Sequence, residues 1–69
     1  MDTHNWQAEQ SWRTAFRRLA NHILDLEVER RKYAQEYAAG HGVRGTLEEI
    51  DRRLKRAREQ LADLERERR

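Results

Sequence analysis

Apolar residues recur along the N-terminal half of the chain at alternating spacings of four and three. The series runs Trp12, Phe16, Leu19, Ile23, Leu26, Tyr33 and Tyr37. Arg30 occupies the one position where an apolar residue is missing from this series. Such spacing is the heptad repeat of a helix that packs along one narrow stripe against another helix. The pattern therefore predicts one long helix, from about residue 5 to residue 39.

A second run of apolar positions with the same alternation follows in the C-terminal half. Its members are Leu47, Ile50, Leu54, Ala57, Leu61 and Leu64. This run predicts a second helix over about residues 47–67, again with a single apolar stripe.

The segment Gly-His-Gly-Val-Arg-Gly, residues 40–45, separates the two runs and contains all three glycines of the chain. Glycine adopts the positive φ angles that end a helix and turn the backbone, so we expect a loop over residues 40–46. Thr46 and Glu49 have the spacing of a capping box, in which both side chains accept hydrogen bonds from free backbone N–H groups. The capping box predicts that the second helix begins at Leu47.

A short loop joins antiparallel neighbours, so the predicted fold is all-α: one domain, residues 1–69, folded as an antiparallel two-helix coiled-coil hairpin. Charge pairing favours a register in which Arg30 lies over Ala57 while Glu27 meets Arg58. Other facing pairs in that register are Glu36 with Arg53, His22 with Glu67, and Leu19 with Arg68. Exposed ion pairs contribute only about 0.2–1 kcal/mol each, so charge selects a register more than it stabilises the hairpin.

In this register the first helix extends about 15 Å beyond the second. Trp12 and Phe16 would need partners beyond the end of the chain, so the sequence predicts that they find none within it. We therefore expect oligomerisation or a partner protein to complete the hairpin, giving a structure that resembles a four-helix bundle.

The composition of the chain supports a helical protein that needs such help. Charged residues make up 41% of the 69 residues, and proline and cysteine are absent. A chain this short buries a small core and has no disulfide to reinforce it. The N-terminus shows no signal peptide and no window is apolar enough to span a membrane, so we expect a cytoplasmic or virion-associated protein that is neither secreted nor transmembrane.

The N-terminal part of the first helix carries the residues we predict to bind a partner. They are Trp6, Trp12, Phe16 and Leu19, edged by Arg13 and Arg17. Tryptophan and arginine are enriched in interface hot spots, which favours a protein–protein contact. Self-association and docking on a different protein both fit this face, and attachment to a membrane surface is less favoured because the face is short.

A second feature is a cluster of cations near the middle of the hairpin. It consists of Arg30, Arg31, Lys32, Arg52, Arg53, Lys55, Arg56 and Arg58. Such a patch suits phosphates or an acidic protein, so a small regulatory nucleic-acid-binding protein is the alternative prediction. Interspersed carboxylates dilute the patch, however, and the chain as a whole carries 15 basic and 13 acidic residues.

The sequence shows no arrangement suited to catalysis, metal binding or a cofactor. His4, His22 and His41 are too scattered to make a metal site, and no two of them have the i, i+4 spacing that places two ligands together on a helix. The glycine-rich loop lacks the Gly-Lys-Ser/Thr ending of a phosphate-binding loop, and no nucleophile lies beside a base. We therefore expect a non-enzymatic protein without cofactor, metal or small-molecule substrate.

Overall fold

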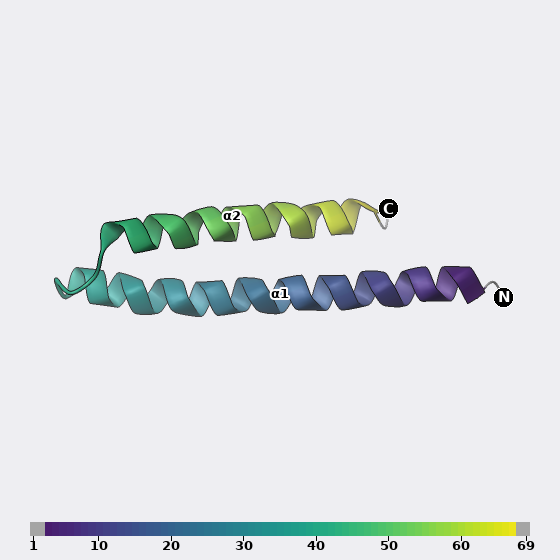
Figure 1. The fold of residues 1–69 in the computed structure, drawn as a ribbon, viewed down its shortest axis with the longest axis horizontal. Helices are drawn as coiled ribbons and strands as arrows, with labels where there is room; N and C mark the ends of the chain where they lie inside the picture. The colour runs from purple at the N-terminus through teal and green to yellow at the C-terminus, as the bar shows by residue number, and fades with distance from the viewer. Residues whose placement is uncertain (1–2, 68–69) are drawn as a thin grey trace.

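Two antiparallel helices make up the part of the chain that the structure describes. The computed structural model describes the backbone of residues 3–67 and the side chains of residues 6–67. Helix α1 spans Thr3–Ala38, helix α2 spans Arg44–Glu67, and residues 39–43 connect them (Figure 1). The molecule is a thin rod of 59 × 15 × 13 Å. The predicted all-α hairpin is confirmed.

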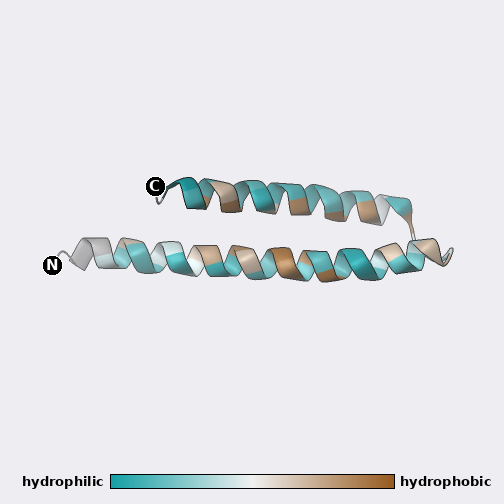
Figure 2. Ribbon diagram, turned by 180° about the vertical axis from the view of Figure 1, so that it is seen from behind, coloured by the Kyte–Doolittle hydropathy of each residue, from teal (hydrophilic) through white to brown (hydrophobic). Residues whose placement is uncertain are grey.

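A single row of apolar side chains between the helices forms the core. Its buried members are Ile23, Leu26, Ile50, Leu54 and Ala57, with Leu19, Tyr33 and Leu61 packed against them. The hydrophobic segments of α2 lie on the side that faces α1 (Figure 2). The apolar stripe on each helix is only one heptad seam wide. Two helices therefore bury the middle of each stripe and leave the residues on either side of it in solvent.

The C-terminus of α1 is closed by a glycine in the conformation that the sequence predicted. Gly40 has a φ of 84°, its N–H donates to the Tyr37 carbonyl at 3.0 Å, and the N–H of His41 donates to the Glu36 carbonyl at 2.8 Å. This pair of bonds is a Schellman motif, which satisfies carbonyls that the helix leaves free. Gly42 then passes close to α1: a Cβ placed on it would lie 2.5 Å from the Tyr37 backbone nitrogen.

The start of α2 differs from the prediction. The helix begins at Arg44, and the Thr46 N–H donates to the Val43 carbonyl at 3.1 Å. Thr46 therefore lies inside the first turn, and the predicted capping box is wrong. The Glu49 carboxylate instead accepts hydrogen bonds from Arg52 and Arg53. Once the chain has passed the turn at Gly40, each further helical residue adds a backbone hydrogen bond, which favours the earlier start.

The earlier start also changes the register of the two helices. Glu27 and Arg58 form the predicted ion pair at 3.2 Å. Arg30, however, binds the Asp51 carboxylate, so its predicted position over Ala57 is wrong. With α2 starting close to the end of α1, it lies roughly one to two helical turns nearer the N-terminus of α1 than predicted. Arg68, the predicted neighbour of Leu19, lies outside the described residues.

Candidate protein-docking surface

The N-terminal end of α1 extends beyond the end of α2. With 36 residues in α1 and 24 in α2, a rise of 1.5 Å per residue gives lengths of about 54 Å and about 36 Å. The loop holds the other ends together, so the difference appears beside the C-terminus of α2 (Figure 1). The overhang that the sequence predicted is present, although the shifted register alters which residues it carries.

Trp12 is not left without a partner in its own chain, so that prediction is wrong. Its indole N–H donates to the Leu64 carbonyl oxygen at 2.7 Å across the hairpin. Leu64 lies in the last turn of α2. Trp12 therefore acts as a side-chain cap on the C-terminus of α2, because the observed register carries α2 far enough to meet it.

Phe16 and Leu19 divide their surface between the hairpin and solvent. The rings of Trp12 and Phe16 stack with centroids 4.9 Å apart and an interplanar angle of 22°. Both rings are half-buried, and Leu19 packs at the edge of the core. The three side chains thus form a bridge from the core to the overhang.

Trp6 is the member of the predicted surface that the hairpin leaves most open. Its residue is 60% exposed. Trp6, Glu9, Arg13 and Phe16 follow one another at spacings of three, four and three, which places them on one face of α1. Arg13 pairs with Glu9 at 3.2 Å, and Arg17 is exposed beside them. A large apolar ring therefore stands in solvent among charged side chains.

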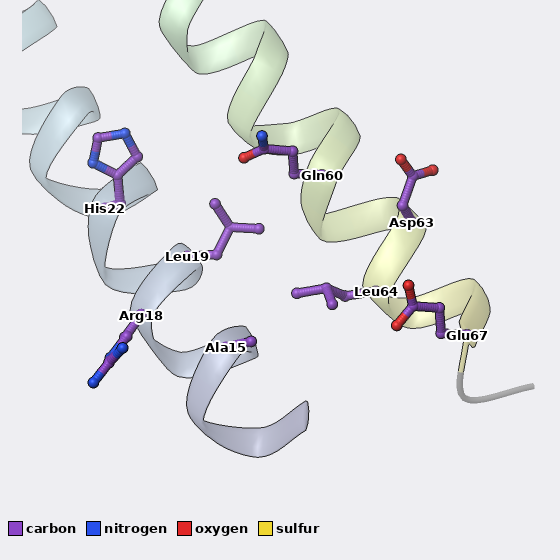
Figure 3. Close-up of a pocket in the computed structure, with 8 residues that line it drawn as sticks. All are labelled: Ala15, Arg18, Leu19, His22, Gln60, Asp63, Leu64 and Glu67. Atoms are coloured by element: carbon purple, nitrogen blue, oxygen red, sulfur yellow. The ribbon is translucent and has the colours of Figure 1, made fainter. Parts of the chain in front are cut away.

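A shallow groove opens between the helices on another side of this end. It has a volume of about 510 Å³ and is lined by Ala15, Arg18, Leu19, His22, Gln60, Asp63, Leu64 and Glu67 (Figure 3). Leu19 and Leu64 point toward each other across it, while the charged side chains lie at its rim (Figure 3). The heptad pattern does not predict this groove, because the groove depends on which residues of α2 face Ala15.

Two further apolar side chains on α1 escaped the sequence analysis. Leu24 and Val28 are 58% and 59% exposed. They lie outside the heptad stripe, but they continue a row spaced by four residues from Phe16 through Ala20. Such a row winds away from the core seam and onto the outer surface of a helix. Counting that spacing could have detected them.

Half of the cations in the predicted basic patch pair with carboxylates of the same chain. Arg30 pairs with Asp51, Arg58 with Glu27, and Arg52 and Arg53 with Glu49. The hydrogen bonds from Arg52 and Arg53 lower the pKa of the Glu49 carboxyl, and the bond to Asp51 raises the pKa of Arg30.

The other four cations of the patch have different surroundings. Lys32 lies 5.8 Å from the centre of the Tyr33 ring. Arg31, Lys55 and Arg56 are exposed. The cluster is therefore a mixed surface of cations and carboxylates, not a continuous basic face.

The described residues offer neither a metal site nor a membrane span. No three His, Asp or Glu side chains among residues 6–67 gather closely enough to hold an ion, and His4 lies outside the described side chains. Neither helix, over its described length, is long and apolar enough to cross a bilayer.

Comparisons with protein families, with curated proteins and with solved structures give no match to this chain. What the surface does must therefore be inferred from its own geometry and chemistry.

Proposed function

We propose that this chain is a non-enzymatic assembly module that associates with itself through the N-terminal face of α1. We define the docking face as Trp6, Trp12, Phe16 and Leu19, with Arg13 and Arg17 at its edge. The observation that carries the proposal is the exposed indole of Trp6 on a length of helix that α2 does not cover.

The energetics of the docking face support association. A whole tryptophan side chain can bury about 150–250 Å², and apolar area contributes about 25 cal/mol per Å². Trp6 is 60% exposed, so covering it stabilises a complex by about 2–4 kcal/mol. Within the described hairpin, buried apolar residues number only five. For a domain with so small a core, burial between chains is a large part of the available stabilisation.

Sedimentation equilibrium over a range of concentrations tests the proposal. We expect the wild-type chain to dimerise reversibly and Trp6→Ala to raise the dimer Kd by at least about 30-fold, as for a hot-spot residue. Tyr37→Ala is the matched control, because Tyr37 is an exposed aromatic residue at the opposite end of α1. Equal Kd values for wild type and Trp6→Ala would refute the docking face.

Nucleic-acid binding has less support than self-association, because carboxylates of the same chain already pair with half of the cationic cluster. Salt separates the two functions. Assembly through apolar rings should persist in 0.5 M salt, whereas binding to phosphates should weaken by orders of magnitude. Dimerisation that disappears with added salt would count against the proposed face.

A further inference from the structure

We propose that the second copy docks antiparallel to the first, with Trp6 of each chain packed on Phe16 of the other and Glu9 of each chain paired with Arg13 of the other. This inference rests on the proposed self-association and adds its geometry. The two α1 helices would cross near Ser11, the midpoint of both pairs, and a two-fold axis would relate them.

The contact follows a second heptad seam on α1. Trp6, Glu9, Arg13, Phe16 and Ala20 repeat at spacings of three, four, three and four, as the core seam does. Within this seam the Arg13 side chain is 61% exposed, while Phe16 and Ala20 are half-buried at the edge of the hairpin. The α2 helix packs on the neighbouring seam of Ile23 and Leu26. It leaves Trp6 and Arg13 of the second seam exposed and Glu9 partly exposed.

Heptad geometry restricts how two such seams can pair. In antiparallel helices the two kinds of seam position face each other, so the allowed registers differ by whole heptads. The register centred on Ser11 sets ring against ring and carboxylate against guanidinium. A slide of one heptad would set Trp6 against Ile23, which the hairpin already buries, and would separate Glu9 from Arg13. Complementary charge therefore selects one register among the few that packing permits.

The size of the contact predicts its strength. Trp6 is 60% exposed and Phe16 is already half-buried in the hairpin, so two copies of each ring, at about 150–250 Å² for a whole ring, supply well under half of the 1,600 Å² typical of stable complexes. The dimer should therefore be reversible, with a Kd on the order of micromolar. A chain whose apolar ends associate this weakly would exist as a monomer when dilute and as a dimer when concentrated.

Charge reversal in mixed chains tests the register. In a dimer of Glu9→Arg chains, position 9 of each copy faces the native Arg13 of the other, so both facing pairs become like-charged. A dimer of Arg13→Glu chains has the corresponding clash of carboxylates. We expect each variant alone to dimerise about tenfold more weakly than wild type.

An equimolar mixture of the two variants should recover most of the wild-type affinity, since every facing pair between unlike chains is then opposite in charge. Both chains in the mixture still lack the Glu9–Arg13 bond within α1. If that bond acted only within one helix, mixing would restore nothing. Recovery of affinity in the mixture would therefore mean that residues 9 and 13 pair between chains.

Disulfide trapping provides a second measurement, because the chain has no cysteine of its own. When Glu9→Cys and Arg13→Cys chains are mixed and oxidised, the disulfide between unlike chains should form in preference to those between like chains. If the wild type dimerises, but mixing the charge variants restores no affinity and mixing the cysteine variants gives no preference for the unlike disulfide, the register is overturned. Self-association itself would then still stand. Wild type that stays monomeric at 100 μM would overturn both.

Discussion

Replacing Trp12 by phenylalanine separates the capping role of its indole from the packing of its ring. The variant keeps an aromatic ring beside Phe16 but removes the N–H that donates to the Leu64 carbonyl at 2.7 Å. That carbonyl would then face the half-buried edge of the hairpin without its donor, and the last turn of α2 should fray.

The size of the effect follows from the hydrogen bond. One such bond contributes about 0.5–1.5 kcal/mol net to folding stability. An unfolding entropy of about 2.1 cal/mol/K per residue gives this 69-residue chain roughly 0.15 kcal/mol per kelvin, so Tm should fall by about 3–10 °C.

Thermal unfolding followed by circular dichroism, at a concentration where sedimentation shows monomer, measures this fall. Trp6→Phe is the control, because Trp6 is exposed and its replacement should leave the monomer's Tm within about 1 °C of wild type. Hydrogen exchange followed in 1H–15N NMR spectra adds a direct measurement. The indole N–H of Trp12 should exchange with solvent more slowly than that of Trp6. Equal exchange rates, together with an unchanged Tm in Trp12→Phe, would refute the cap.

Four further substitutions test the loop and the start of α2, the surface charges and the core. Gly45 lies in the first turn of α2, and a Cβ placed on it would make an ordinary contact with Val43 Cγ1 at 4.0 Å. Gly45→Ala should therefore stabilise the hairpin by about 0.4–1 kcal/mol in urea unfolding. Gly42→Ala should destabilise it, and an opposite order would contradict the loop geometry. Hydrogen bonds from two arginines hold the pKa of Glu49 below its ordinary value. The contribution of the Glu49 carboxylate to folding stability is therefore complete above about pH 4.3, and it is lost as the pH falls through the lowered pKa. The Tm difference between wild type and Glu49→Gln should therefore shrink from pH 6 to pH 2, and a constant difference would exclude this linkage. Leu54 is 3% exposed, and Leu54→Ala should cost about 2–5 kcal/mol, enough to abolish most of the helical circular dichroism; a signal like that of wild type would place Leu54 outside the core.

The helices and the loop were largely predictable from the sequence because their signals are local. The heptad spacing of Ile23 and Leu26 marks the buried face of α1 whatever lies opposite, and Gly40 has the positive φ expected of a helix end. The capping box predicted the wrong helix start, although its signal is also local. The side chains of Thr46 and Glu49 fit a helix start, but α2 already begins at Arg44, soon after the turn at Gly40.

The surroundings of the docking face were less predictable, because they depend on where α2 ends relative to α1. The exposure of Trp6 follows from the overhang and holds across nearby registers. The bond between Trp12 and Leu64 exists in one register only, and no periodicity within either helix specifies it. The same dependence explains why the groove beside Leu19 and the pairing of Arg30 with Asp51 were missed.

The sequence alone determined that two amphipathic helices form, that glycine ends the first, and that the first is too long for the second to cover. Only the tertiary structure decided how far the helices slide past each other, and with it the partner of Trp12. Periodicity is a property of each helix by itself. The slide of one helix along the other is set by the geometry of the short loop, which outweighs surface ion pairs worth about 0.2–1 kcal/mol each. An α2 that begins at Arg44 shifts the helices past each other, although the long side chains of Glu27 and Arg58 still meet. Ion pairs that weak do not hold the helices in another register.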